Sequence, residues 1–244
     1  MNYRMELQYE GTRYNGWQRQ DSTENTIQGK LEQVLCRMTG ERIEVQGAGR
    51  TDSGVHAKMQ VANFHTEKEL RPEDIRNYMN RYLPEDIAVT FCTEASERFH
   101  SRLNAKGKVY QYRIWNSEKP NVFERRWVYE YPDKLDIQAM ESAAGFLMGT
   151  HDFKSFCTRK KMKKKTVRTI TGIRIEVFGE EVRITYEGDG FLYHMVRILT
   201  GTLIEVGIHE RSPKDILHIF EEKDRSAAGF LVPAKGLTLL NVMY

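Results

Sequence analysis

The first third of the chain changes its hydrophobic period several times, and this succession constrains the fold more than any other feature. Tyr3, Met5, Leu7 and Tyr9 alternate with polar residues, which predicts a strand. Apolar residues then recur at helical spacing from 27 to 38, before a predicted stop at glycine 40. The pattern continues with a strand at 43–45, a strand at 59–66, a helix from residue 72 and a strand at 87–92. This βαββαβ order is typical of a ferredoxin-like unit.

The second half of the chain shows a related but less regular succession. Its predicted elements are strands at 108–115 and 126–131, a helix at 136–148, a hairpin of 167–178 and 182–187, an apolar helix at 192–207, a short helix after Pro213 and a strand at 237–243. From residue 126 onward the order is again roughly βαββαβ, with one added helix. We therefore expect an α+β protein of two ferredoxin-like halves, residues 1–103 and 104–244. Their sheets would join around a central cleft that holds the site.

Composition excludes several classes of protein. The three cysteines, Cys36, Cys92 and Cys157, lie far apart and in no CxxC pair, which argues against a disulfide framework and a cysteine zinc site. The start of the chain lacks the basic and apolar regions of a secretory signal, and no apolar run approaches the roughly 20 residues that span a bilayer. We expect a cytoplasmic protein.

Positive charge is concentrated in one short stretch, although the net charge is only +3. The cationic residues there are Arg159, Lys160, Lys161, Lys163, Lys164, Lys165 and Arg168. Such a run is commonly a solvated loop. It would also suit a polyanion, because clustered cations release counterions from phosphates. The run alone leaves both interpretations open.

The segment QGAGRTDSGVHA, residues 46–57, is the most unusual stretch. It lies between two predicted strands and packs Arg50, Asp52 and His56 among glycines that permit close approach of another chain. It is not a Walker loop, because no Gly-Lys-Ser/Thr follows, and it is not a dinucleotide fingerprint, because no helix follows. A single Asp in such a turn commonly forms only an Asx-turn.

Five segments in order resemble motifs of the TruA family of tRNA pseudouridine synthases. They are YEGTRYNGWQ (9–18), GRTDSGVHA (49–57), KVYQY (108–112), GFLYHMVR (190–197) and PAKGLTL (233–239). The resemblance spans nearly the whole chain. It implies an enzyme that isomerises uridine to pseudouridine at nucleotides 38–40 of the tRNA anticodon stem-loop, acts as a homodimer and binds its RNA in the cleft.

The resemblance also assigns roles to individual residues. Asp52 matches the nucleophile, which would add to C6 of the uracil, attack C1′ or assist through a glycal; the sequence does not choose among these routes. Arg197 matches the basic residue that pairs with this carboxylate. Tyr110 matches the tyrosine that stacks on the target base. The isomerisation is redox-neutral, so we expect no cofactor or metal.

Three further assignments concern contacts with the RNA. Arg50 would fill the space left by a flipped base or bind the phosphate of the flipped nucleotide. Leu237 would pack beneath the uracil. The RNA-binding candidates are Lys160, Lys161, Lys163, Lys164, Lys165 and Arg168. We interpret His56 as structural, because the mechanism needs no imidazole.

Three alternatives have different sequence signatures. A non-catalytic RNA-binding module could share the fold, but the chain has no RNP1-like strand. A metal-dependent hydrolase could use some of the seven histidines, but they form no HExxH motif. A pseudouridine synthase with another RNA target would carry the same catalytic residues, and the sequence does not exclude it.

Overall fold

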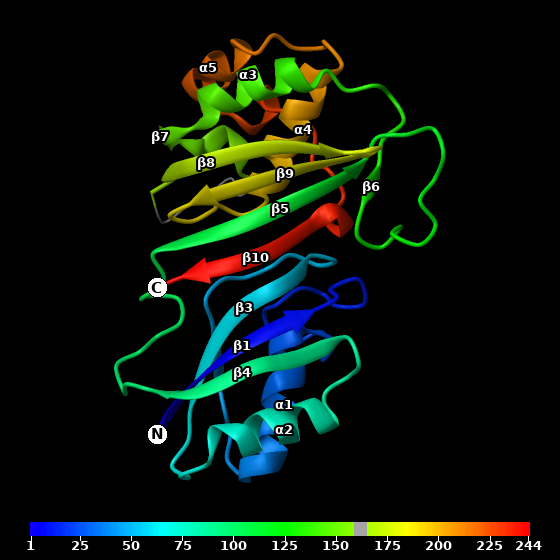
Figure 1. Ribbon diagram of the computed structural model, residues 1–244. Coiled ribbons are helices and arrows are strands. Elements are labelled where there is room, and N and C mark those ends of the chain that lie inside the picture. The colour runs from blue at the N-terminus through cyan, green and yellow to red at the C-terminus, as the bar shows by residue number, and fades with distance from the viewer. Residues whose placement is uncertain (159–164) are drawn as a thin grey trace. The chain divides into compact units, whose positions relative to one another are not determined.

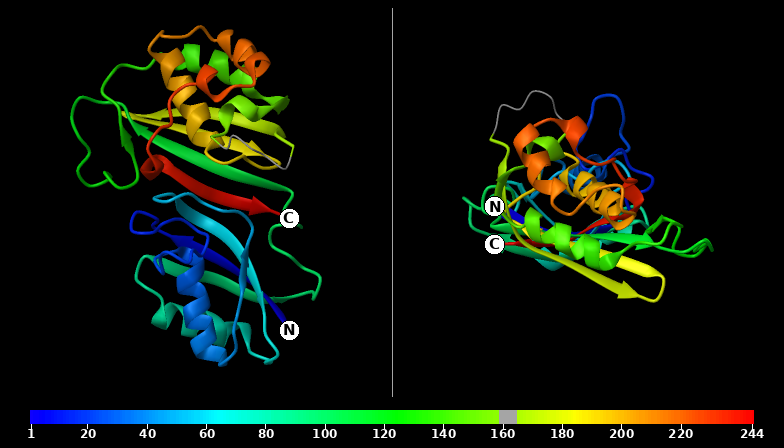
Figure 2. Two further views of the ribbon diagram at one scale, coloured as in Figure 1. Left: turned by 180° about the vertical axis from the view of Figure 1, so that it is seen from behind. Right: turned by 90° about the horizontal axis from the view of Figure 1, so that it is seen from above.

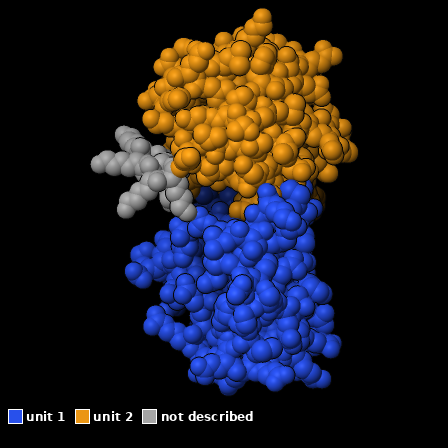
Figure 3. Space-filling model, turned by 90° about the vertical axis from the view of Figure 1, so that its left-hand side faces the viewer, with its two compact units in different colours: residues 1–106, 238–244 blue, residues 107–237 orange. Residues whose placement is uncertain are grey.

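A computed structural model describes residues 1–158 and 165–244 of the chain, which is a mixed α+β protein. Contacts divide it into two compact units, coloured in Figure 3: unit 1 is residues 1–106 with 238–244, and unit 2 is residues 107–237. The boundary that we expected at 103/104 thus falls at 106/107. The last strand, expected in the second half, groups with unit 1. Among the described helices, none has the length and apolar character needed to cross a membrane.

Unit 1 is a sheet with two helices. Its elements are β1 (Asn2–Tyr9), α1 (Ile27–Thr39), β2 (Val45–Gly47), β3 (His56–His65), α2 (Pro72–Tyr82), β4 (Ile87–Ala95) and β10 (Leu237–Met243). The strand order is β4-β1-β3-β10, and β2 also pairs with β3. All these pairings are antiparallel except that of β10 with β3. Both helices cover the same face of the sheet, as Figures 1 and 2 show.

Local sequence accounts for the first elements of unit 1. The alternation that predicted β1 is confirmed, because Tyr3, Met5 and Leu7 are fully buried. Helix α1 begins after Thr26, whose hydroxyl accepts a hydrogen bond from the Gly29 amide. It ends at Gly40 in the left-handed conformation, with φ of 73°, so the predicted stop is confirmed.

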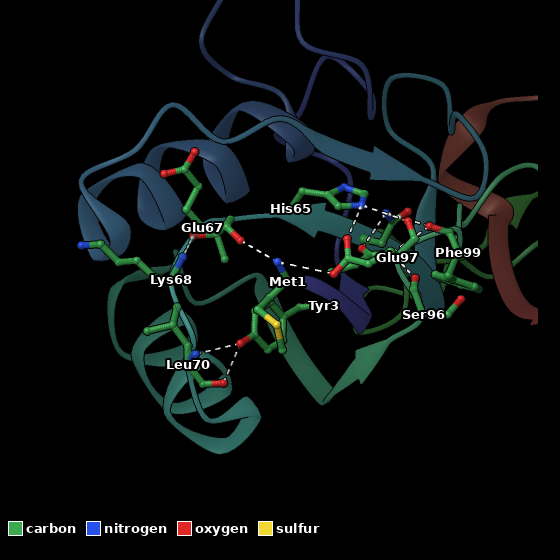
Figure 4. Close-up of polar contacts among 12 residues, drawn as sticks. Met1, Tyr3, His65, Glu67, Lys68, Leu70, Ser96, Glu97 and Phe99 are labelled. Atoms are coloured by element: carbon green, nitrogen blue, oxygen red, sulfur yellow. Dashed lines mark hydrogen bonds and ion pairs between the residues drawn. The ribbon is translucent and has the colours of Figure 1, made fainter.

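Polar contacts tie the start of β1 to two other segments (Figure 4). The amino group of Met1 donates to the Thr66 carbonyl at 2.9 Å and lies 3.5 Å from Glu97 Oε1. The Tyr3 hydroxyl donates to the Leu70 carbonyl at 2.8 Å and accepts from the Leu70 amide at 2.7 Å. These contacts hold the β1 strand in register between β3 and β4.

In its described residues, unit 2 contains a group of paired strands and three α-helices. Its elements are β5 (Gly107–Trp115), β6 (Tyr129–Glu130), α3 (Ile137–Leu147), β7 (Gly149–Asp152), the 3₁₀ turn η1 (Phe153–Phe156), β8 (Val167–Phe178), β9 (Glu181–Gly188), α4 (Met195–Gly207), α5 (Asp215–Glu222) and the 3₁₀ turns η2 (Arg225–Ala227) and η3 (Ala234–Gly236). The strand order is β5-β9-β8-β7, with β6 parallel to β5. The predicted hairpin of β8 and β9 is confirmed.

Several elements of unit 2 differ from the sequence-based prediction. The strand expected at 126–131 is reduced to β6, because the Trp127 and Val128 amides turn back to the Glu124 carbonyl. Strand β7 was not expected. Helix α4 begins three residues late, because His194 has a left-handed backbone with φ of 66°. In unit 1, β2 likewise lies two residues after its predicted start.

The core of unit 2 lies between its strands and helices. Tyr112 and Ile114 of β5 and Ile184 and Tyr186 of β9 are fully buried. The Tyr186 hydroxyl lies 2.9 Å from the Thr200 hydroxyl, which joins β9 to α4. The inward face of β5, which also carries Tyr110, therefore has α4 as a neighbour.

Candidate active site

The Asp52 loop, residues 48–55, joins β2 to β3 and is fixed at both of its ends. The Ala48 amide donates to the Val61 carbonyl at 2.7 Å, and the Gln60 side-chain amide donates to the Gly49 carbonyl at 2.9 Å. The Val55 amide donates to the Asp52 carbonyl at 3.2 Å and closes a turn. Asp52 is partly exposed within this turn, whereas Arg50 is exposed. The carboxylate is therefore carried by an anchored turn.

The segment that follows β1, residues 10–17, binds this loop along its length. The Trp17 amide donates to the Thr51 carbonyl at 3.0 Å. The Ser53 hydroxyl donates to the Tyr14 carbonyl at 3.0 Å. The residues immediately before and after Asp52 are thus each hydrogen-bonded to this segment. The segment of residues 10–17 therefore forms a clamp on the Asp52 loop, on both sides of Asp52.

Glycine makes this close approach possible at two positions of the segment. A Cβ atom on Gly11 would lie 2.0 Å from the Val55 carbonyl oxygen. A Cβ atom on Gly16, whose φ is 86°, would lie 2.8 Å from the Thr51 carbonyl oxygen. Contacts this short are not tolerated, so any larger residue would push the two stretches apart.

Tyr9, the last residue of β1, supports the loop from inside the unit. Its hydroxyl lies 2.8 Å from the Thr51 hydroxyl and accepts a longer bond of 3.5 Å from the Gln60 side chain. Burial raises the pKa of Tyr9 to about 12, although the bonds to Thr51 and Gln60 reduce the rise. The phenol therefore stays neutral at ordinary pH and acts as a hydrogen-bonding support.

A polar network secures the residues just beyond Trp17. The buried Glu32 carboxylate of α1 accepts from the Val45 amide at 3.0 Å and from the Arg19 guanidinium at 2.7 Å. The side chain of Gln28 donates to Glu32 and accepts from the Arg19 amide. Because these bonds satisfy the buried polar groups of Glu32 and Gln28, α1 fixes the path of the chain on this side of the clamp.

In unit 2, Tyr110 and Arg197 lie on neighbouring elements, β5 and α4. Tyr110 is only 7% exposed, and the Phe191 ring meets it edge-on with 5.3 Å between centroids. Arg197 Nε donates to the Val232 carbonyl at 2.8 Å. This bond attaches the first turns of α4 to the segment that leads to Leu237.

The segment before Leu237 is also held by β5. The Tyr112 hydroxyl donates to the Pro233 carbonyl at 2.7 Å, and Leu237 is 5% exposed. Burial raises the pKa of Tyr112 well above its ordinary value, and the nearby charge of Arg197 opposes the rise. Arg197, Tyr112 and the 232–237 segment therefore belong to one neighbourhood of unit 2.

Comparison with known proteins gives a consistent assignment. The family model described as tRNA pseudouridine synthase matches residues 7–103 and 143–244. The chain is 48% identical over its full length to tRNA pseudouridine synthase A of Bacillus sp. (strain KSM-64), covering 99% of that protein. It is 48% identical to tRNA pseudouridine synthase A 1 of Clostridium tetani and 43% identical to tRNA pseudouridine synthase A 2 of Bacillus cereus (strain ATCC 14579), in each case over 100% of this chain and 99% of the relative.

The chain belongs to the TruA family of tRNA pseudouridine synthases. The two ranges matched by the family model include the Asp52 loop, the segment that clamps it, Arg197 and Leu237. Tyr110 lies between the two ranges, in a part of the chain that the full-length relatives cover.

The site residues expected from the sequence are distributed over the two units. Arg50 and Asp52 share one loop of unit 1, whereas Tyr110, Arg197 and Leu237 belong to unit 2. Of the basic candidates, Lys160, Lys161, Lys163 and Lys164 lie outside the described residues. Lys165 is exposed, and its carbonyl accepts a hydrogen bond from the partly exposed Arg168.

Sequence reasoning missed the residues that support the site in this TruA protein. It did not identify Tyr9, Thr51 or Ser53 as partners around Asp52, or Phe191 as the ring against Tyr110. Their partners lie far along the chain, so no local periodicity reports them. The glycines of residues 46–57 indicated that another chain could approach this loop closely, but they did not show that the partner is the segment that carries Gly11 and Gly16.

Proposed function

We propose that this protein isomerises uridine to pseudouridine in tRNA, at nucleotides 38–40 of the anticodon stem-loop, with Asp52 as the nucleophile. One observation carries the proposal: a partly exposed carboxylate sits in a turn that is anchored before and after it, inside a chain of the TruA family. Such preorganisation is what a single catalytic carboxylate needs. As a member of this family, the protein is an isomerase that acts on tRNA.

The reaction requires little beyond this positioned group. The bond from C1′ to N1 of the uracil breaks, the base turns over, and a bond from C1′ to C5 forms. N1 gains a proton and C5 loses one, so atoms and electrons balance without an oxidant or a co-substrate. Asp52 would serve through addition at C6, attack at C1′ or a glycal.

The remaining residues receive roles within the same proposal. Arg197 keeps the Asp52 carboxylate ionised and aimed, and its bond to Val232 would restrict the directions that its guanidinium can take. Tyr110 stacks on the target base, and the edge-on ring of Phe191 would set its orientation. Arg50 binds the flipped nucleotide or fills its place, and Leu237 packs beneath the uracil.

The proposal extends to architecture and partners. Each half of the chain is a decorated ferredoxin-like unit, and tRNA binds in a central cleft between these two halves. The protein is a cytoplasmic homodimer. The β4-β1-β3 order of unit 1, with the short β2 beside β3, supports the ferredoxin-like arrangement of the first half. Among the described residues, no group of three His, Cys, Asp or Glu side chains is arranged to hold a metal ion.

The decisive experiment is tritium release from tRNA carrying [5-³H]uridine, which reports loss of hydrogen from C5. We expect release by the wild type and none by Asp52→Asn or Asp52→Ala, both with retained tRNA binding. Asp21→Asn, a change of the same kind at an exposed residue, is the control and should behave like the wild type. Mapping of pseudouridine in the product then tests nucleotides 38–40.

Two other outcomes would point to the alternatives. Release from another RNA but not from tRNA would identify a synthase with a different target. Binding of RNA without release from any RNA would identify a non-catalytic RNA-binding module.

A further inference from the structure

His56, the first residue of β3, follows the turn that carries Asp52 and is buried. Only 2% of the surface of His56 is exposed. The Gly11 amide donates to His56 Nδ1 at 3.0 Å. A ring nitrogen that accepts from an N–H group cannot itself carry a proton. The imidazole is therefore neutral, with its proton on Nε2.

Glu10 stands next to the same nitrogen, with its Oε1 atom 3.5 Å from Nδ1. That oxygen also accepts from the Thr12 amide at 3.0 Å and from the Thr12 hydroxyl. It therefore has donors on its own turn and does not require a histidinium. The Gly11 amide, by contrast, needs an acceptor at this place because it is buried.

The bond from Gly11 has a defined place in the clamp around Asp52. Gly11 passes so close to the chain that its missing Cβ would lie 2.0 Å from the Val55 carbonyl oxygen. The turn that starts at Gly11 is closed by the Tyr14 amide at 3.0 Å, and the Tyr14 carbonyl accepts from Ser53. The imidazole thus anchors one end of a short turn whose other end holds the residue after Asp52.

We propose that His56 is a positioning residue for Asp52, and that it acts through the acceptor nitrogen Nδ1. The ring holds the Gly11 turn in the register that lets Ser53 and Thr51 fix the carboxylate. This inference rests on the proposed function, because positioning is measured by the reaction that Asp52 performs. A role in folding alone would lower the stability of the variants and leave the single-turnover rate of the folded protein unchanged.

The test compares three substitutions that separate the two ring nitrogens. In His56→Asn, the side-chain oxygen can occupy the place of Nδ1 and accept from Gly11. In His56→Gln, the amide reaches the place of Nε2 and leaves Gly11 without its acceptor. His56→Leu removes both. His65→Leu, at an exposed histidine of the same strand, is the matched control.

We expect a clear order in the single-turnover rate constant with [5-³H]uridine tRNA. His56→Asn and His65→Leu should stay within about threefold of the wild type, whereas His56→Gln and His56→Leu should fall by roughly 100-fold. The Kd for tRNA should stay unchanged in all four. Equal rates for His56→Asn and His56→Leu, or losses that appear in the Kd instead of the rate, would overturn the proposal.

A second measurement does not depend on activity or on folding of the variants. The ¹⁵N resonances of His56 in the wild-type protein should report an unprotonated Nδ1 and a protonated Nε2. A proton on Nδ1 would overturn the inference.

If the wild type converts no uridine in any tRNA, the proposed function fails and the positioning role falls with it. If the wild type is active and the variants do not separate, only the inference on His56 fails.

Discussion

The Tyr9 hydroxyl and the Thr51 hydroxyl lie 2.8 Å apart in the interior of unit 1, one residue from Asp52. This bond joins the end of β1 to the loop, across a sequence separation of 42 residues. Together with the backbone bond from Trp17 to Thr51, it places the residue before Asp52 under two independent constraints. We therefore expect changes at this bond to affect both stability and activity.

The bond between Tyr9 and Thr51 gives the first prediction. Tyr9→Phe should lower the free energy of unfolding by about 1–2 kcal/mol, because the buried Thr51 hydroxyl loses its partner. Single-turnover isomerisation should slow as well. The double variant Tyr9→Phe/Thr51→Val should be less destabilised than the sum of the single changes, since both partners are then removed. Urea unfolding measures all three, with Tyr78→Phe as the control; strict additivity would show that the two hydroxyls are not coupled.

The contact of Gly47 with Trp17 gives the second prediction. A Cβ atom on Gly47 would lie 2.4 Å from the Trp17 ring, which is 2% exposed. Gly47→Ala should therefore cost about 1–3 kcal/mol of stability and displace the segment that clamps the Asp52 loop.

Gly145 provides the matched control for this change. It is exposed on α3, and a Cβ atom added there would meet no atom of the described residues within 4 Å, its chain neighbours and its own helix backbone apart. Gly145→Ala should raise the stability by about 0.5–1 kcal/mol, because alanine favours the helix. Thermal or urea unfolding measures the stability of both variants. If the two substitutions changed the free energy of unfolding in the same direction, the steric argument would be wrong.

The ion cluster around Glu181 gives a prediction about pH. Burial alone would raise the pKa of Glu181, but its bonds to Arg113 and Arg183 and their charges outweigh this and lower the pKa from 4.5 to about 2. A lowered carboxyl pKa stabilises the folded state above the unfolded pKa. That contribution is lost as the pH falls from 4.5 towards about 2.

Glu181→Gln should therefore lower the free energy of unfolding by about 1–2 kcal/mol at neutral pH, allowing for solvent screening. The difference in stability between this variant and the wild type should become smaller as the pH falls from 4.5 towards about 2. Glu187→Gln, at an exposed residue of the same strand, is the control. Urea unfolding from pH 7 to pH 2 measures the difference. A deficit that is constant with pH would rule out the ion pairs as its cause.

The exposed Lys165 gives a prediction about RNA binding. If this lysine neutralises a phosphate, Lys165→Gln should weaken tRNA binding and reduce the slope of log K against log salt by about 1. Lys223→Gln is the control, because the Lys223 amine already lies 3.7 Å from the Asp152 carboxylate. The single-turnover rate at saturating enzyme should not change. An unaltered salt slope would remove Lys165 from the RNA-binding surface.

Local patterns in the sequence determined much of the secondary structure. The alternation of β1, the helical spacing and glycine stop of α1, and the turn between β8 and β9 were predictable because each depends on residues within one or two turns of chain. The resemblance to the TruA family likewise indicated Asp52 as the candidate nucleophile from a continuous motif. Each of these features depends on residues that are close together in the sequence.

Tertiary structure alone decided which distant residues support the site. The pairing of β10 with β3, the four-residue strand β7 and the clamp of residues 10–17 on the Asp52 loop leave no periodic signal. The same holds for His56, whose role depends on an amide that lies 45 residues away in the chain. Hydrogen bonds and steric contacts of this kind arise from folding in three dimensions. The sequence by itself therefore indicated Asp52 as the candidate nucleophile, and the fold determined what holds its loop in place.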